Sequence, residues 1–132
     1  MKIAAITDDG KTISRHFGRA RYYLVCIIED ARITGQELRE KAGHHSFAPQ
    51  QRTNHHAPDP HGFDSASRSR HAQMLAVIAD CQAVLAGGMG LGMQRNLEEV
   101  GIRPLLTDVE DIEEAVRAFA EGRLAVRPEL AH

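Results

Sequence analysis

Residues 82–106, QAVLAGGMGLGMQRNLEEVGIRPLL, indicate the fold class. The apolar run at Gln82–Ala86 predicts a short buried strand, which leads into closely spaced glycines. A helix is expected next, because three apolar residues recur at helical spacing and Gly101 is placed to end it. The residues expected to face inward are Met93, Leu97 and Val100. A second strand at Ile102–Leu106 completes a β-α-β unit, whose two strands should be parallel and joined by a right-handed crossover.

The segment before this unit contains three more predicted strands. Lys2–Thr7 and Tyr22–Ile28 are apolar runs, and the charged stretch Ile33–Arg39 is typical of an edge strand. A tight turn at residues 29–32 makes the three strands a meander. The predicted sheet therefore has five strands in the order 3-2-1-4-5, with only strand 2 antiparallel to its neighbours.

Two further helices complete a predicted α/β fold with three helices. Serines before residue 70 offer N-caps for the first helix, which should run to about Asp80. The last helix is expected at residues 108–121, where Thr107 and Glu110 fit a capping box.

The chain is expected to form one domain over residues 1–124, followed by an irregular tail at 125–132. Its 132 residues are 42% hydrophobic and 26% charged, which is ordinary for a globular domain. A long loop at residues 41–66 holds five of the eight histidines. Cys26 and Cys81 lie in apolar runs, which favours buried free thiols over a disulfide.

Charge and hydropathy exclude several classes of partner. The net charge is -2 with neutral histidines, and no basic tail or stripe is present, so no nucleic-acid partner is expected. No apolar stretch approaches the ~20 residues of a membrane span, and the N-terminal apolar run is too short for a signal peptide. A cytoplasmic location without a membrane partner is therefore expected.

The predicted topology brings three segments to one edge of the sheet. Strands 1 and 4 should be parallel neighbours whose connections leave in opposite directions, which makes their carboxyl ends a topological switch point. The sequence RHFGR at residues 15–19, the glycines after strand 4 and the loop at 41–66 should all lie there. His71, in the first turns of the following helix, should stay near the same rim.

The histidines are candidate metal ligands, because neutral imidazole binds iron, copper, nickel and zinc. The predicted ligands are His44, His45, His55, His56, His61 and His71. Their spacing does not match a standard zinc motif, since no cysteine accompanies them. The alternative is a solvated polar loop that is merely rich in histidine, with His71 a core or rim residue bonded to a backbone carbonyl.

The glycine-rich turn after strand 4 is a candidate anion site, because free N–H groups and the helix dipole point outward from such a turn. The candidate cofactor-binding residues are Arg15, His16, Arg19, Gly88, Met89 and Gly90. The spacing GGMGLG is neither a dinucleotide fingerprint nor a P-loop, so a nucleotide is not expected. Met89 and Met93 could also serve as soft ligands for copper(I). The alternative is that the glycines only let the strand pack closely on the helix and that the methionines belong to the core.

Three segments, KIAAITDD, ISRHFGRARYYLV and CQAVLAGGMGLGMQRNLEEVGIRPL, occur in this order along the chain. Together they resemble the dinitrogenase iron-molybdenum cofactor biosynthesis family, which contains NifX-like proteins and the C-terminal part of NifB. The resemblance covers most of the chain and implies an RNase H-like fold that binds iron-molybdenum cluster precursors or related molybdenum-containing clusters. The chain is also similar to the small orange protein of sulfate reducers, which holds a molybdenum-copper sulfide cluster.

The leading hypothesis is a non-enzymatic accessory or biosynthesis protein. It would bind or carry an anionic metal-sulfur cluster, of the iron-molybdenum or the molybdenum-copper type, and exchange it with a cluster-donor or acceptor protein. A metal-independent regulatory or protein-interaction domain is the main alternative. A nuclease is the weaker one, because two-metal nucleases need several converging carboxylates and strand 1 supplies only Asp8 or Asp9.

Overall fold

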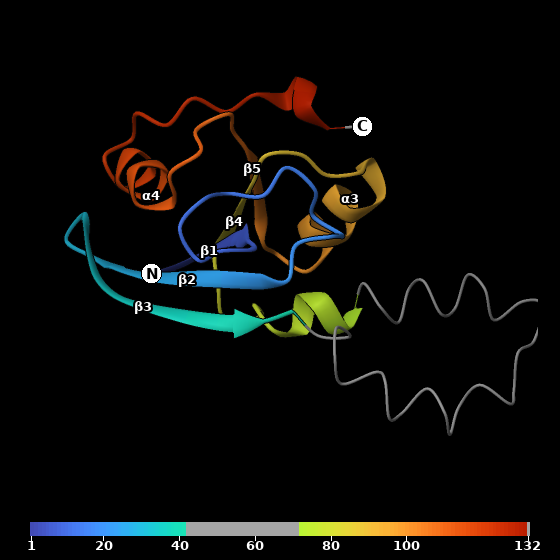
Figure 1. Cartoon of the computed structure of the whole chain (residues 1–132), viewed down its shortest axis with the longest axis horizontal. Coiled ribbons are helices and arrows are strands. Elements are labelled where there is room, and N and C mark those ends of the chain that lie inside the picture. The colour runs from blue at the N-terminus through green and yellow to red at the C-terminus, as the bar shows by residue number, and fades with distance from the viewer. Residues whose placement is uncertain (42–71, 132) are drawn as a thin grey trace, which may run out of the picture.

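Five strands form one mixed sheet in the computed structural model, which describes residues 1–41 and 72–131 (Figure 1). The strands are β1 (Lys2–Thr7), β2 (Tyr22–Glu29), β3 (Arg32–Glu40), β4 (Ala83–Ala86) and β5 (Arg103–Leu106). Their order is β3-β2-β1-β4-β5, and only β2 runs antiparallel to its neighbours. The sheet predicted from the sequence is confirmed in order and in strand direction.

The centre of the sheet is buried on both faces. All of β4 and every residue of β1 except Lys2 are buried, as their apolar sequences require when helices cover both faces. β1 and β4 are parallel and pair from Ile3 with Ala83 to Ala5 with Leu85. Their carboxyl ends therefore lie side by side at one edge of the sheet.

The β2–β3 hairpin brings the end of β3 back to this same edge. Its two central residues, Asp30 and Ala31, have φ angles of 53° and 63°. Positive φ at both positions is the geometry of a type I′ turn, whose twist matches that of the flanking strands. β3 consequently runs parallel to β1, and Lys41 follows it at the edge where β1 ends.

Helices cover the two faces of the sheet. Residues 72–76 are helical, and α3 (Leu91–Glu99) and α4 (Ile112–Ala120) follow. On one face, Gln36 of β3 donates to Glu113 of α4 at 3.4 Å. On the other, the Tyr23 hydroxyl donates to the Met74 carbonyl at 2.9 Å. Figure 1 shows α4 and the helix at 72–76 on opposite sides of the strands.

Two helix boundaries differ from the sequence predictions. The helix at 72–76 does not reach Asp80. Residues 77–80 form turns, in which a backbone N–H bonds to the carbonyl three residues earlier, as Ile78 N does to Leu75 O at 3.1 Å. α4 begins at Ile112 because Asp111 is its N-cap and accepts from the Glu114 N–H at 2.9 Å. The predicted capping box of Thr107 with Glu110 is therefore wrong.

The end of α3 corrects another expectation. Met93 and Leu97 are buried as predicted, but Val100 is 59% exposed. Val100 is the C-cap residue, and Gly101 follows it with a φ of 84°, so the chain turns away before Val100 can reach the core. Gly101 thus ends the helix as expected.

The C-terminal residues are more regular than expected. Arg127 N donates to Leu106 O at 2.7 Å, and a short 3-10 helix, η1 (Pro128–Leu130), follows. Ala131 then forms a parallel bridge with Met89. These contacts bind the tail along the end of β5 and beside the glycine-rich segment. Among the described residues, no helix is long and apolar enough to cross a membrane.

Candidate functional site

The loop after β1 is organised around two carboxylates. Asp9 accepts from the backbone N–H groups of Thr12 and Lys11, each at 2.8 Å, and from the Thr12 hydroxyl at 2.9 Å. These bonds hold the pKa of Asp9 well below its usual range. Asp8 accepts from the Arg21 N–H at 3.0 Å. Both acids therefore shape the loop, and its path is set before any ligand arrives.

The HFGR turn, residues 16–19, is closed by its own backbone. The His16 carbonyl accepts from the N–H groups of Arg19 at 3.2 Å and Ala20 at 3.1 Å. Phe17 is only 2% exposed and anchors the turn in the core, whereas His16, Gly18 and Arg19 are exposed. The turn thus presents an imidazole and a guanidinium on a fixed backbone.

The chain leaves β4 in close contact with the loop after β1. Gly87 N donates to Ser14 O at 2.8 Å. A Cβ atom at Gly87 would lie 3.0 Å from both Ser14 O and Arg15 Cα. Those neighbours are backbone atoms, which cannot swing aside as a side chain can, so any larger residue would force the two segments apart by a few tenths of an ångström.

The Gly-Met-Gly bend, residues 88–90, leads into the N-terminus of α3. Gly90 is the N-cap residue and supplies no side-chain cap, and the first turn contains no acidic residue. The free N–H groups of that turn therefore keep the partial positive charge of a helix N-terminus.

The HFGR turn and the Gly-Met-Gly bend enclose a pocket of about 420 Å³. Its described lining residues are His16, Phe17, Gly18, Arg19, Met74, Met89, Gly90, Gly92 and Met93. None of them is acidic. The pocket therefore brings together four of the six residues predicted to bind a cofactor, and Gly88 lies buried beside it without lining it.

Arg15 lies in a different hollow. It lines a pocket of about 220 Å³ together with Gly87 and with residues after β5, including Asp108 and Glu110. Its guanidinium is 3.5 Å from the Glu110 carboxylate. The described lining of this hollow shares no residue with that of the pocket of His16 and Arg19. The structure therefore does not place the two predicted arginines at one site.

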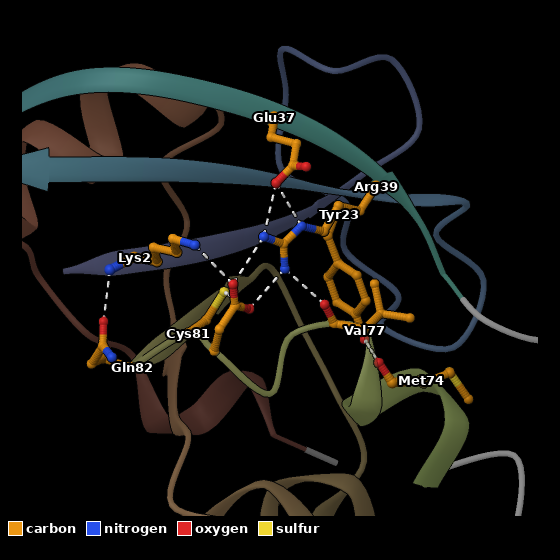
Figure 2. A network of polar contacts seen from close by, with 9 residues as sticks. Lys2, Tyr23, Glu37, Arg39, Met74, Val77, Cys81 and Gln82 are labelled. Carbon is orange, nitrogen blue, oxygen red and sulfur yellow. Dashed lines mark hydrogen bonds and ion pairs between the residues drawn. The ribbon is translucent and has the colours of Figure 1, made fainter.

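A network of polar contacts fixes the helix that carries Met74 (Figure 2). Arg39 binds both carboxylate oxygens of Asp80, at 2.8 and 3.0 Å, and donates to the Val77 carbonyl at 2.8 Å. Figure 2 shows Arg39 reaching from β3 to this segment, with Glu37 on its other side. The Arg39 guanidinium, helped by Lys2, holds the pKa of Asp80 well below its usual range. With the Tyr23 bond to Met74, this network ties one wall of the pocket to the sheet.

The predicted metal ligands lie outside the described residues. They are His44, His45, His55, His56, His61 and His71. In residues 1–41 and 72–131, no three His, Cys, Asp or Glu side chains gather as a metal ion would require.

Cys26 and Cys81 are buried free thiols, as predicted, and burial raises the pKa of each to about 11. They are therefore protonated near neutral pH and poor metal ligands.

Three residues near the pocket were not singled out from the sequence. Phe17 is part of the HFGR motif, and its apolar side chain between exposed neighbours was a usable signal for an anchor. Met74 lies in the helix at 72–76, and its place in the same pocket as His16 depends on tertiary packing. Lys41 follows a charged edge strand, and no local pattern predicted that it would be 3% exposed.

Comparisons with known proteins agree with this architecture. An uncharacterized protein of Methanocaldococcus jannaschii, MJ0580, is 25% identical over 124 residues, which cover 94% of this chain and 89% of that protein. The crystal structure of PH0822 is similar with a TM-score of 0.65, 23% identity and 98% of both chains covered. The apo form of the orange protein from Desulfovibrio gigas is similar with a TM-score of 0.61 and 20% identity, over 96% of this chain and 92% of that one.

These solved structures share the fold. The family described as dinitrogenase iron-molybdenum cofactor matches residues 1–122, which include every strand, the HFGR turn, the Gly-Met-Gly bend and α4. The chain therefore belongs to the dinitrogenase iron-molybdenum cofactor family.

Proposed function

We propose that this protein is a carrier or accessory protein that binds an anionic metal-sulfur cluster or thiometallate in the pocket between the HFGR turn and the Gly-Met-Gly bend. The observation that carries the proposal is the composition of the pocket. Its described lining contains Arg19 and His16 and no carboxylate, and the uncapped N-terminus of α3 adjoins it. The guanidinium, the absence of carboxylates from the described lining and the helix N-terminus favour an anion over a cation.

The remaining lining suits a sulfide-rich cargo. Met74, Met89 and Met93 present soft, polarisable thioethers, which pack favourably against sulfur and can ligate copper(I). A volume of about 420 Å³ lies within the usual range for small-ligand sites, roughly 300–1,000 Å³. The described residues offer positive charge, N–H donors and sulfur rather than a chelating cage, so they suit a preassembled cluster better than a single ion. The six predicted histidine ligands remain a prediction.

Nuclease activity fits this site poorly. The two acids at the end of β1, Asp8 and Asp9, are held by backbone N–H groups of their own loop. No acidic residue lines the pocket in the described part of the chain. A two-metal mechanism would need converging carboxylates that these residues do not supply.

Tetrathiomolybdate, with and without copper(I), is the probe that tests the proposal. Purified protein should bind it stoichiometrically and change its visible absorption spectrum. Arg19→Gln should weaken binding about tenfold or more, because a hydrogen bond to a charged group contributes roughly 1.5–3 kcal/mol. Arg15→Gln should weaken it much less, since Arg15 lies in the other hollow.

A distant arginine provides the matched control. Arg32 begins β3 at the opposite edge of the sheet, so Arg32→Gln removes the same charge without touching the pocket. Absence of binding by the wild-type protein, or equal weakening by all three arginine variants, would refute a specific site at this pocket. A metal-independent docking protein would give the first of these results.

A further inference from the structure

Lys41 is a buried cation directly behind the pocket. It is 3% exposed, and its backbone N–H donates to Arg21 O at 3.1 Å just beyond the end of β3. Lysine is rarely buried to this extent unless it is paired. In the described residues, no carboxylate lies within ion-pair distance of its ammonium. Among the described residues, the partners of this ammonium must therefore be groups other than carboxylates.

The Lys41 ammonium contacts the inner side of the HFGR turn. Nζ donates a hydrogen bond to the Phe17 carbonyl and lies 4.4 Å from the centroid of the Phe17 ring. It is also 5.6 Å from the centroid of the Tyr23 ring, which meets Phe17 edge-on at 6.1 Å. The ammonium is thus held by a carbonyl and two aromatic rings. Because Phe17 lines the pocket, this cation and the cargo would be separated by one side chain.

Holding the Phe17 carbonyl also orients the next amide. In a planar trans peptide, the Phe17 C=O and the Gly18 N–H point in opposite directions. The carbonyl points inward to Lys41, so the Gly18 N–H points away from it. No backbone hydrogen bond of the described residues uses that N–H, and the space around Gly18 is open. The turn therefore offers a free donor whose direction depends on Lys41.

We propose that Lys41 is a positioning residue of the cargo site: its ammonium fixes the Phe17–Gly18 peptide so that the Gly18 N–H faces an anionic cargo, and its buried charge strengthens the binding. This inference rests on the proposed function, because it assigns a further residue to the same pocket.

The charged groups around Lys41 favour a measurable pH dependence. Burial lowers the pKa of Lys41 to about 8, and Asp8, in the loop after β1, partly offsets that effect. Tyr23, from β2, donates its hydroxyl proton to Met74 O, and burial raises its pKa far above the usual range. Arg39, two residues earlier on β3, is occupied by Asp80 and Glu37. Of Lys41, Tyr23 and Arg39, Lys41 is thus the side chain whose charge should change between pH 7 and 9.5.

The experiment measures the affinity of the full chain for tetrathiomolybdate at pH 7 and pH 9.5. Wild-type affinity should fall roughly tenfold as Lys41 loses its proton. Lys41→Met should bind about tenfold more weakly at pH 7 and show little further change at pH 9.5. Lys41→Arg should bind more tightly than Lys41→Met and be equally insensitive to pH. Lys11→Met removes one exposed lysine charge that does not line the pocket, and it should follow the wild type.

A second readout needs no cargo. In the wild-type protein, the Gly18 amide resonance should titrate with a midpoint near pH 8, and it should not do so in Lys41→Arg. A wild-type affinity that is flat across this pH range, or a Gly18 resonance that does not titrate, would overturn the inference even if Lys41→Met fails to fold. If the wild type binds no tetrathiomolybdate at either pH, the proposed function fails, and the Gly18 titration alone decides whether Lys41 sets the turn.

Discussion

Replacing Lys41 by methionine should change how the stability of the protein depends on pH. Burial lowers the pKa of Lys41 to about 8 from an ordinary value of 10.5. The unfolded chain therefore holds this proton up to about pH 10.5, whereas the folded chain releases it near pH 8. Between these values the unfolded state binds more protons, so the free energy of unfolding should rise with pH.

The size of this effect follows from the two pKa values. A difference of one pKa unit corresponds to about 1.4 kcal/mol, so burying the Lys41 charge costs about 3 kcal/mol below pH 8. That cost disappears as the pH rises to about 10.5, where the unfolded chain also releases the proton. Methionine keeps an unbranched apolar stem of similar length and has no proton to lose. The stability of the wild type relative to Lys41→Met should therefore increase by about 3 kcal/mol from pH 7 to pH 10.5.

Urea unfolding followed by circular dichroism at the two pH values measures this difference. Other titrating groups are present in both proteins and cancel in the comparison. Lys41→Arg is the matched control, because arginine stays charged in both states and should give no such rise relative to methionine. If the free energies of unfolding of the wild type and Lys41→Met change equally between the two pH values, burial does not lower the pKa of Lys41. That result would refute the reasoning.

The remaining predictions concern stability and can be measured by urea unfolding at pH 7. Gly87→Ala should cost about 1–3 kcal/mol, because its Cβ would meet backbone at 3.0 Å, whereas Gly92→Ala, in open space on α3, should be neutral or stabilise by up to about 1 kcal/mol. Asp111→Ala should cost about 1 kcal/mol by removing the N-cap of α4, whereas Glu110→Ala should cost much less. Arg39→Met should cost about 1–3 kcal/mol, since it breaks a bidentate ion pair and a bond to a backbone carbonyl. Equal losses within either matched pair would contradict the assigned contacts.

The strands could be predicted because their signals are local. An apolar run such as Lys2–Thr7 identifies a strand buried on both faces, and the structure has this strand with the same ends. Strand order and direction followed from the rules of chain connection, which leave few arrangements for three strands followed by alternating helices and strands. Helix ends were harder, because several side chains can compete for the same cap. Thr107 is fully buried and accepts from the Val109 N–H at 3.2 Å, which leaves Asp111 to cap α4.

The candidate site was predicted in part for similar reasons. The switch-point rule correctly brought the HFGR turn and the Gly-Met-Gly bend to one edge of the sheet. It could not separate Arg15 from Arg19, because the hollow that each side chain lines depends on the tertiary path of the loop after β1. Neither could it reveal Lys41, because a lysine after a charged edge strand is normally exposed.

The way the pocket is held together bears on how a carrier can both bind and release its cargo. Backbone hydrogen bonds or buried side chains fix the HFGR turn, the contact between Gly87 and the loop after β1, and the helix at 72–76. Within the described residues, none of these bonds uses the imidazole of His16 or the guanidinium of Arg19. A fixed backbone lowers the ordering cost of binding, because the donors are already in place. Exposed side chains on that backbone make contacts that solvent can replace one at a time, so a rigid backbone with free side-chain ends suits reversible binding better than permanent retention.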